Sequence, residues 1–212
     1  MTTARPGSRA VPALLYLLTL LTILSGAVRT VQVPLDAIPA DSAHLRTTPF
    51  AIWVHALGGT LFGLLGPWQF SGAMRRRFGR AHRVTGRIFA GAGFAMAASG
   101  LSLLLSHPDT SGALVDTGRG VFGVALIAAL ALAIQAIRLG DRDGHRDWMI
   151  RSYALGMGTA PVALVFLPIY VLTGTPPMGL WADIVFIGSW VVALIVAELV
   201  IRRLHHPVGV PA

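Results

Sequence analysis

Six stretches of this 212-residue chain are each long and apolar enough to cross a lipid bilayer. An α-helix needs about 20 mostly apolar residues to span a hydrocarbon core roughly 30 Å thick. Inside that core every backbone N–H and C=O must find a partner within the protein, and a helix satisfies them within its own segment. The sequence therefore predicts an all-α fold, a polytopic transmembrane bundle of six helices at about residues 11–31, 49–70, 87–106, 118–138, 148–173 and 181–201.

The composition and the spacing of these segments support one lipid-embedded unit. Charged residues make up 12% of the chain, whereas soluble domains have roughly 25%. The connecting segments are too short for a soluble domain, so residues 1–212 are predicted to form a single integral membrane domain. The absence of cysteine excludes disulfides, thiolate metal sites and a cysteine nucleophile. Pro161 and Pro168 fall inside the fifth segment, where we expect kinks rather than helix ends.

The basic residues predict the orientation of these helices. All 17 are arginine, and cytoplasmic loops of membrane proteins carry an excess of positive residues. Six crossings place 14 of the 17 on one side, namely Arg5, Arg9, Arg75, Arg76, Arg77, Arg80, Arg83, Arg87, Arg138, Arg142, Arg146, Arg151, Arg202 and Arg203. Both termini are therefore predicted to be cytoplasmic, in a multi-pass protein of the cell inner (cytoplasmic) membrane. The net charge of +8 then reflects topology and contact with anionic lipid head groups rather than nucleic-acid binding.

The first apolar segment also has an alternative interpretation. Arg5 and Arg9, the apolar run 11–24 and the small residues Ser25 to Ala27 fit a cleavable signal peptide. The apolar stretch continues through Val28, which makes it long enough for a membrane anchor. Cleavage would leave five helices in the same orientation.

Two similar polar motifs, "AHRVTGR" at 81–87 and "GHRDWMIRSYA" at 144–154, are candidate sites. Their histidines, His82 and His145, precede the predicted helices 87–106 and 148–173 by similar margins, so we expect them at similar depth. Two neutral imidazoles on facing elements can hold haem iron, and guanidinium groups can bind its propionates. The candidate propionate partners are Arg83, Arg87, Arg146 and Arg151. Alternatively, both motifs are interfacial anchors, with arginines on lipid phosphates, Trp148 in the aromatic belt and Asp147 paired with an arginine.

A third candidate is His55, which shares one helical face with Gly59 and Gly63 at a spacing of four residues. The missing side chains leave a groove that could admit a neighbouring helix or a haem with His55 as axial ligand. None of the other five predicted helices carries a histidine at matching depth. The alternative is a neutral histidine bonded to a carbonyl or hydroxyl of a neighbouring helix.

Glu198 lies one turn from the inner end of the last predicted helix, where an unpaired carboxylate is costly. We expect an arginine partner at the same depth, Arg151 or Arg87, in a structural ion pair rather than a proton relay. The run Arg75 to Arg77 is typical of a topogenic loop.

Four stretches together resemble one known family. They are "HALGGTLFGLLGPWQF" at 55–70, "HRVTGRIF" at 82–89, "HRDWMIRSYAL" at 145–155, and Trp190 followed by Ala197 and Glu198. The family is that of the bacterial membrane proteins called domain of unknown function 2306, and the resemblance covers about residues 49–203. The chain departs from the family pattern at two positions: it lacks the arginine that often follows "RSYAL" about two turns into the fifth helix and the asparagine that often follows the tryptophan of the last helix. The resemblance implies as site candidates His55, His82, Arg83, Gly86, Arg87, His145, Arg146, Trp148, Arg151 and Ser152.

Two hypotheses for the function follow. The first is a haem-binding redox protein with His55, His82 and His145 as candidate ligands of haem b iron, working with an electron-transfer partner or as a homo-oligomer. The second is a small-solute or lipid-interacting protein, transporter-like or a scaffold, without a cofactor. No nucleophilic triad, zinc signature or paired carboxylates occur in the sequence, so no catalytic residue is predicted.

Overall fold

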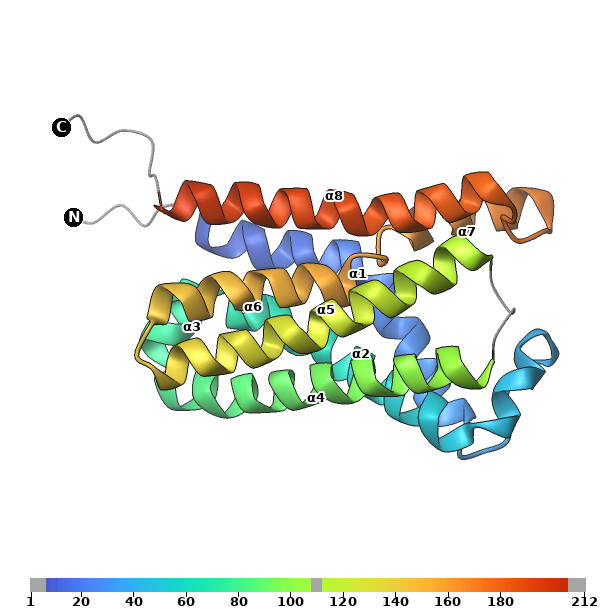
Figure 1. The fold of residues 1–212 in the computed structure, drawn as a ribbon, viewed down its shortest axis with the longest axis horizontal. Coiled ribbons are helices and arrows are strands. Elements are labelled where there is room, and N and C mark those ends of the chain that lie inside the picture. The colour runs from blue at the N-terminus through green and yellow to red at the C-terminus, as the bar shows by residue number, and fades with distance from the viewer. Residues whose placement is uncertain (1–6, 108–111, 206–212) are drawn as a thin grey trace. The chain divides into compact units, whose positions relative to one another are not determined.

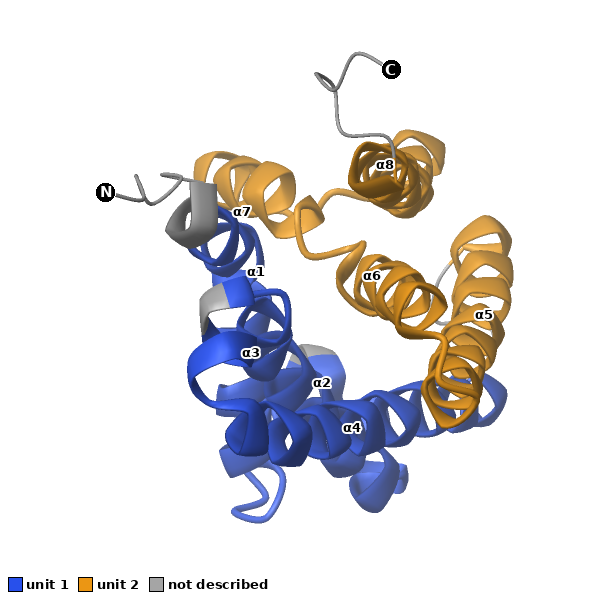
Figure 2. Cartoon of the chain, turned by 90° about the vertical axis from the view of Figure 1, so that its left-hand side faces the viewer, with its two compact units in different colours: residues 1–108 blue, residues 109–212 orange. Residues whose placement is uncertain are grey.

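The computed structural model describes residues 7–107 and 112–205, and all regular structure in these ranges is helical (Figure 1). Six segments are long and apolar enough to cross a membrane: Val11–Gln32, Pro49–Gln69, Gly79–Ser106, Ala113–Arg138, Arg142–Thr173 and Leu180–His205. The predicted six-helix membrane fold is therefore confirmed. Contacts within the chain divide it into two compact units, residues 1–108 and 109–212 (Figure 2). The single integral domain stays a prediction.

The described residues of unit 1 form five helices in chain order. They are α1 (Gly7–Gln32), the 3-10 helix η1 (Ala40–Thr47), α2 (Pro49–Gln69), the short α3 (Gly72–Arg77) and α4 (Gly79–Ser106). Helix α2 packs against both α1 and α4. Pro49 begins α2, where a missing N–H costs nothing, and the Ser71 hydroxyl caps α3 by accepting a hydrogen bond from the Met74 N–H at 3.3 Å.

Close approach of α2 to α4 depends on small residues. A Cβ at Gly58 would lie 2.9 Å from the carbonyl oxygen of Ala92 and 3.0 Å from the Met96 nitrogen, so only glycine fits there. One turn further on, the rings of Phe62 and Phe89 stack at 4.1 Å and are fully buried. Lipid tails are as apolar as these side chains, so van der Waals packing of closely approaching helices holds the pair together.

Unit 2 contains α5 (Ala113–Arg138), α6 (Arg142–Met157), α7 (Val162–Thr173) and α8 (Leu180–His205). Helices α5 and α6 form a tight hairpin, in which Gly140 adopts a positive φ of 81° at the turn. The Asp141 side chain then caps α6 by accepting a hydrogen bond from the Gly144 N–H at 2.8 Å. Helix α8 packs on α6, and the Trp190 indole donates a hydrogen bond to the Leu155 carbonyl at 2.8 Å.

The fifth predicted helix is interrupted, which corrects the expectation that its prolines only kink it. Helix α6 ends at Met157 and α7 begins at Val162, with turns between them. Pro161 has no N–H to donate to the carbonyl four residues earlier, so the α-helical ladder stops there. Ser189 of α8 donates a hydrogen bond to the Gly158 carbonyl, so this backbone group at the interruption has a partner on another helix. Pro168, in contrast, lies inside α7 without ending it.

Helices α4 and α6 begin earlier than predicted, at Gly79 rather than residue 87 and at Arg142 rather than residue 148. His82 and His145 were expected to precede their helices, and that expectation was wrong, because each is the fourth residue of its helix. The physical reason is that hydropathy marks the lipid-immersed part of a helix, whereas the helix itself continues into the polar interface. Helices α3 and η1 were not predicted for the same reason, because both lie outside the apolar runs.

Candidate functional site

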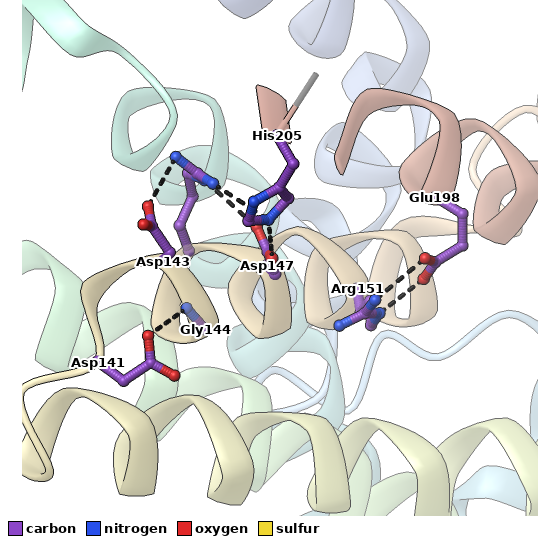
Figure 3. A network of polar contacts seen from close by, with 8 residues as sticks. Asp141, Asp143, Gly144, Asp147, Arg151, Glu198 and His205 are labelled. Carbon is purple, nitrogen blue, oxygen red and sulfur yellow. Dashed lines mark hydrogen bonds and ion pairs between the residues drawn. The ribbon is translucent and has the colours of Figure 1, made fainter. Parts of the chain in front are cut away.

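The best-defined polar cluster in the described chain joins α6 to the last turns of α8 (Figure 3). We call it the α6–α8 polar network, formed by Asp143, Arg146, Asp147, Arg151, Glu198 and His205. Asp143, Asp147 and Arg151 recur every four residues, which places them along one side of α6, and Arg146 lies between Asp143 and Asp147, three residues after the first.

The deeper part of this network is the ion pair of Arg151 with Glu198. The arginine Nε lies 2.6 Å from Oε1 of Glu198 and its Nη2 lies 3.0 Å from Oε2, so two parallel hydrogen bonds join α6 to α8. The guanidinium carbon also lies 4.7 Å from the centre of the Trp148 ring, within the range of a cation–π contact. An arginine partner for Glu198 was predicted, and of the two candidates the partner is Arg151.

The second part of the network is centred on the buried carboxylate of Asp147. Its Oδ1 lies 3.3 Å from Nε of Arg146, which confirms the predicted arginine partner, and its Oδ2 lies 2.6 Å from Nε2 of His205. Arg146 also reaches Oδ1 of Asp143 at 3.1 Å. His205 was missed from the sequence because it follows the last apolar run. Its position about one turn beyond the last apolar run, near the depth of Asp147, could have indicated this contact.

His145 of the same helix faces α5 instead of α8. Its Nδ1 lies 2.8 Å from the carbonyl oxygen of Ala133. Because a carbonyl only accepts, the ring must donate through Nδ1–H, and the lone pair of the neutral imidazole is then on Nε2. Among the residues that the structure describes, this Nε2 has no hydrogen-bond partner.

In unit 1, His55 contacts α4 in a comparable way. Its Nδ1 lies 2.9 Å from the Met96 carbonyl oxygen, and its ring fits over Gly100, where a Cβ would come within 3.1 Å of Nδ1. Gly59 faces the Met96 sulfur, 3.4 Å from the position of a Cβ. The groove beside His55 is thus covered by a neighbouring helix, which confirms the expectation of close packing and of a histidine bonded to a carbonyl. Its role as a haem ligand stays a prediction.

Of the remaining predicted residues, Ser152 of α6 is fully buried and donates a hydrogen bond to the Trp148 carbonyl at 2.7 Å, and the others lie in the first three turns of α4. His82 is half-buried, whereas Arg83 and Arg87 are exposed and form no ion pair with any described residue. Beside them, the Gln69 amide donates a hydrogen bond to the Thr85 hydroxyl at 2.7 Å, and Gly86 leaves room for that amide. Arg146 and Arg151 are thus the predicted site residues that the structure brings into one network. In residues 7–107 and 112–205 no three His, Asp or Glu side chains gather as a metal site.

A chain whose described residues form six apolar spans, with polar groups paired between the helices and many large apolar side chains exposed, is a multi-pass membrane protein. The chain belongs to the family described as "Predicted membrane protein (DUF2306)", whose model matches residues 52–201. The family resemblance of the sequence motifs is thereby confirmed, and the match includes His55, His145 and the pair of Arg151 with Glu198. No curated protein and no solved structure matches the chain.

The ion pair between α6 and α8 generates a first prediction. Arg151→Met or Glu198→Met alone leaves one charge without its partner in a membrane span, so each should lower the stability of the protein in detergent micelles. The double variant should be more stable than the sum of the two single effects predicts, with a coupling of about 0.5–3 kcal/mol. Thermal or denaturant unfolding of all four proteins measures it.

The matched control replaces Arg138, which is exposed and forms no ion pair with any described residue. The Arg138→Met and Glu198→Met effects should add to within about 0.5 kcal/mol. If the effects of Arg151→Met and Glu198→Met added equally well, the ion pair would contribute nothing to stability.

Proposed function

We propose that this membrane protein is a haem-binding redox protein in which His145 supplies an axial ligand. One observation carries the proposal, the hydrogen bond from the His145 Nδ1–H to the Ala133 carbonyl. Histidines that ligate a metal through one ring nitrogen almost always donate the other N–H to a carboxylate, a backbone carbonyl or water. His145 has this arrangement, with its Nε2 lone pair available.

The other histidine described in unit 2 fits this role less well. Nε2 of His205 is occupied by the Asp147 carboxylate, which favours His145 as the ligand. A single axial histidine holds haem iron in globins and peroxidases, so a second ligand is not required for binding. Haem held at His145 would supply one-electron transfer, and that chemistry requires a redox partner, either another protein or a second copy of this chain.

The structure bears differently on each of the other residues that the sequence predicts as haem ligands or propionate partners. Arg146 and Arg151 already bind carboxylates, so they favour positioning α6 against α8 over binding a propionate. Arg83 and Arg87 remain the propionate partners that the sequence predicts. His55 also donates its Nδ1–H to a backbone carbonyl, and both His55 and His82 remain haem-ligand candidates that the sequence alone predicts.

The haem proposal predicts a reducible chromophore. Protein purified from cells supplied with a haem precursor should show a Soret band and sharpened visible bands after addition of dithionite. His145→Ala should lose most of this absorbance per mole of protein, because the axial nitrogen is removed. The control His205→Ala should keep it. A colourless wild-type protein, or an unchanged spectrum in His145→Ala, would overturn the assignment.

A second candidate function is a lipid-interacting or small-solute protein, transporter-like or a scaffold, that works without a cofactor. The observation that favours it is the set of exposed arginines on α3 and the first turns of α4, which form no ion pair with any described residue. Guanidinium groups bind phosphate oxygens through parallel hydrogen bonds, so anionic head groups are suitable partners.

The proposed orientation places the arginine-rich helix ends and both termini in the cytoplasm, with the protein in the inner membrane. The excess of arginine at these ends supports it. A reporter enzyme active only outside the cytoplasm should be silent when fused after residue 206 and active when inserted beside Asp41. Activity of the fusion after residue 206 would contradict the proposed orientation, because it would place the C-terminus outside the cytoplasm.

A further inference from the structure

The net charge of the protein is distributed unequally between its two units. Residues 1–108 hold ten of the 17 arginines and two of the nine acidic residues, whereas residues 109–212 hold seven of each. The entire net charge of +8 therefore belongs to unit 1. No acidic residue occurs between residues 42 and 108.

Most of this excess is concentrated in 13 residues around the connection between α2 and α4. We call it the α3–α4 arginine cluster, and all of its members are exposed and form no ion pair with any described residue: Arg75, Arg76, Arg77, Arg80, Arg83 and Arg87. The two acidic residues of unit 1, Asp36 and Asp41, precede α2, whereas the cluster follows it. The 21 residues of α2 separate them by about 30 Å at 1.5 Å per residue, well beyond the Debye length in physiological salt.

Three of the seven arginines of unit 2 form ion pairs with carboxylates of that unit, whereas none of the six arginines of the cluster pairs with a described carboxylate. Arg119, Arg146 and Arg151 each lie within 4 Å of a carboxylate of the same unit. The cluster in unit 1 has no such partner among the described residues, and its positive charge is available to an anion from outside the chain.

Within the cluster, two like charges converge on one point. Nη1 of Arg76 lies 3.3 Å and Nη2 of Arg75 lies 3.9 Å from the place where a Cβ would stand on Gly72. Two guanidinium groups this close repel each other unless an anion lies between them. A phosphate group, with several acceptor oxygens, can bind both.

The surroundings of the cluster favour a lipid as the source of that phosphate. Helix α3 connects two membrane spans, so it lies at the boundary of the bilayer. Trp68 and Phe78, which flank α3, are each 50% exposed, and Arg77 stacks on the Phe78 ring at 5.4 Å. Exposed aromatic side chains next to spans are typical of the head-group layer, where arginines contact lipid phosphates.

We propose that the α3–α4 arginine cluster is a binding site for anionic phospholipid head groups, with Arg75 and Arg76 sharing one phosphate. This inference deepens the second candidate function, on which it rests, and it is independent of haem. It locates the lipid site in unit 1, on α3 and the first turns of α4, rather than on every arginine-rich helix end.

The test measures lipid retention by the full-length protein in detergent. Wild type is incubated with equal amounts of phosphatidylglycerol and phosphatidylethanolamine with the same acyl chains, and the bound lipids are counted by native mass spectrometry. We expect phosphatidylglycerol to be retained at least about threefold over phosphatidylethanolamine. Combined Arg75→Gln, Arg76→Gln and Arg77→Gln substitutions should abolish this preference while the lipid-free thermal midpoint stays close to that of wild type.

The matched control removes three exposed arginines from unit 2 by Arg138→Gln, Arg142→Gln and Arg203→Gln, with the same loss of charge. This variant should keep most of the preference. Equal retention of the two lipids by wild type, or an equal loss in both triple variants, would overturn the site. Displacement of the lipid by an equal concentration of inorganic phosphate would also overturn it, in favour of a soluble anion.

The haem spectrum separates failure of this inference from failure of the proposed redox function. Equal retention of the two lipids by a wild-type protein with an intact reducible spectrum would reject the α3–α4 site alone. A retained lipid preference in a colourless protein would reject the haem proposal alone.

Discussion

Hydrocarbon can neither donate nor accept hydrogen bonds, and this constraint explains why most polar side chains of the spans bond to other protein groups. In water an unpaired histidine or carboxylate inside a helix is solvated, whereas in a bilayer it needs a partner from the protein. His55 bonds to a carbonyl of α4, the Gln69 amide to the Thr85 hydroxyl, and Glu198 to the guanidinium of Arg151. Each of these contacts joins two different helices of one unit. The polar residues of the spans therefore select which helices pair, while small residues such as Gly58 permit the close approach.

The spans could be predicted from the sequence because length and hydropathy are properties of the lipid-immersed segment alone. Where each helix begins could not, since the charged first turns of α4 and α6 lie outside the apolar runs. The interruption before α7 depends on Pro161 and on the Ser189 hydroxyl, which reaches the Gly158 carbonyl from a distant part of the chain. No local sequence pattern around Gly158 predicts that Ser189 is its hydrogen-bond partner.

Predictions of the polar contacts succeeded where depth alone decided them. Glu198 and Arg151 lie at similar depth on different helices, so their pairing could be anticipated, although not distinguished from a pair with Arg87. That His55 needs a carbonyl or hydroxyl followed from its place inside a membrane span, whereas the choice of Met96 depends on the register of α2 against α4. His205 was missed because it lies beyond the last apolar run, and its contact with Asp147 depends on α8 continuing in helical form to that residue.

The central claim is that the exposed apolar faces of these helices meet lipid, and the absence of cysteine allows a direct measurement. Val192 lies midway along α8 and Leu139 in the turn between α5 and α6, and both are largely exposed. In opened membrane sheets, a water-soluble maleimide should label the Leu139→Cys variant and leave the Val192→Cys variant unlabelled until the bilayer is dissolved and the protein denatured. Equal labelling of the two variants in intact bilayers would contradict the account, because α8 would then be surrounded by water.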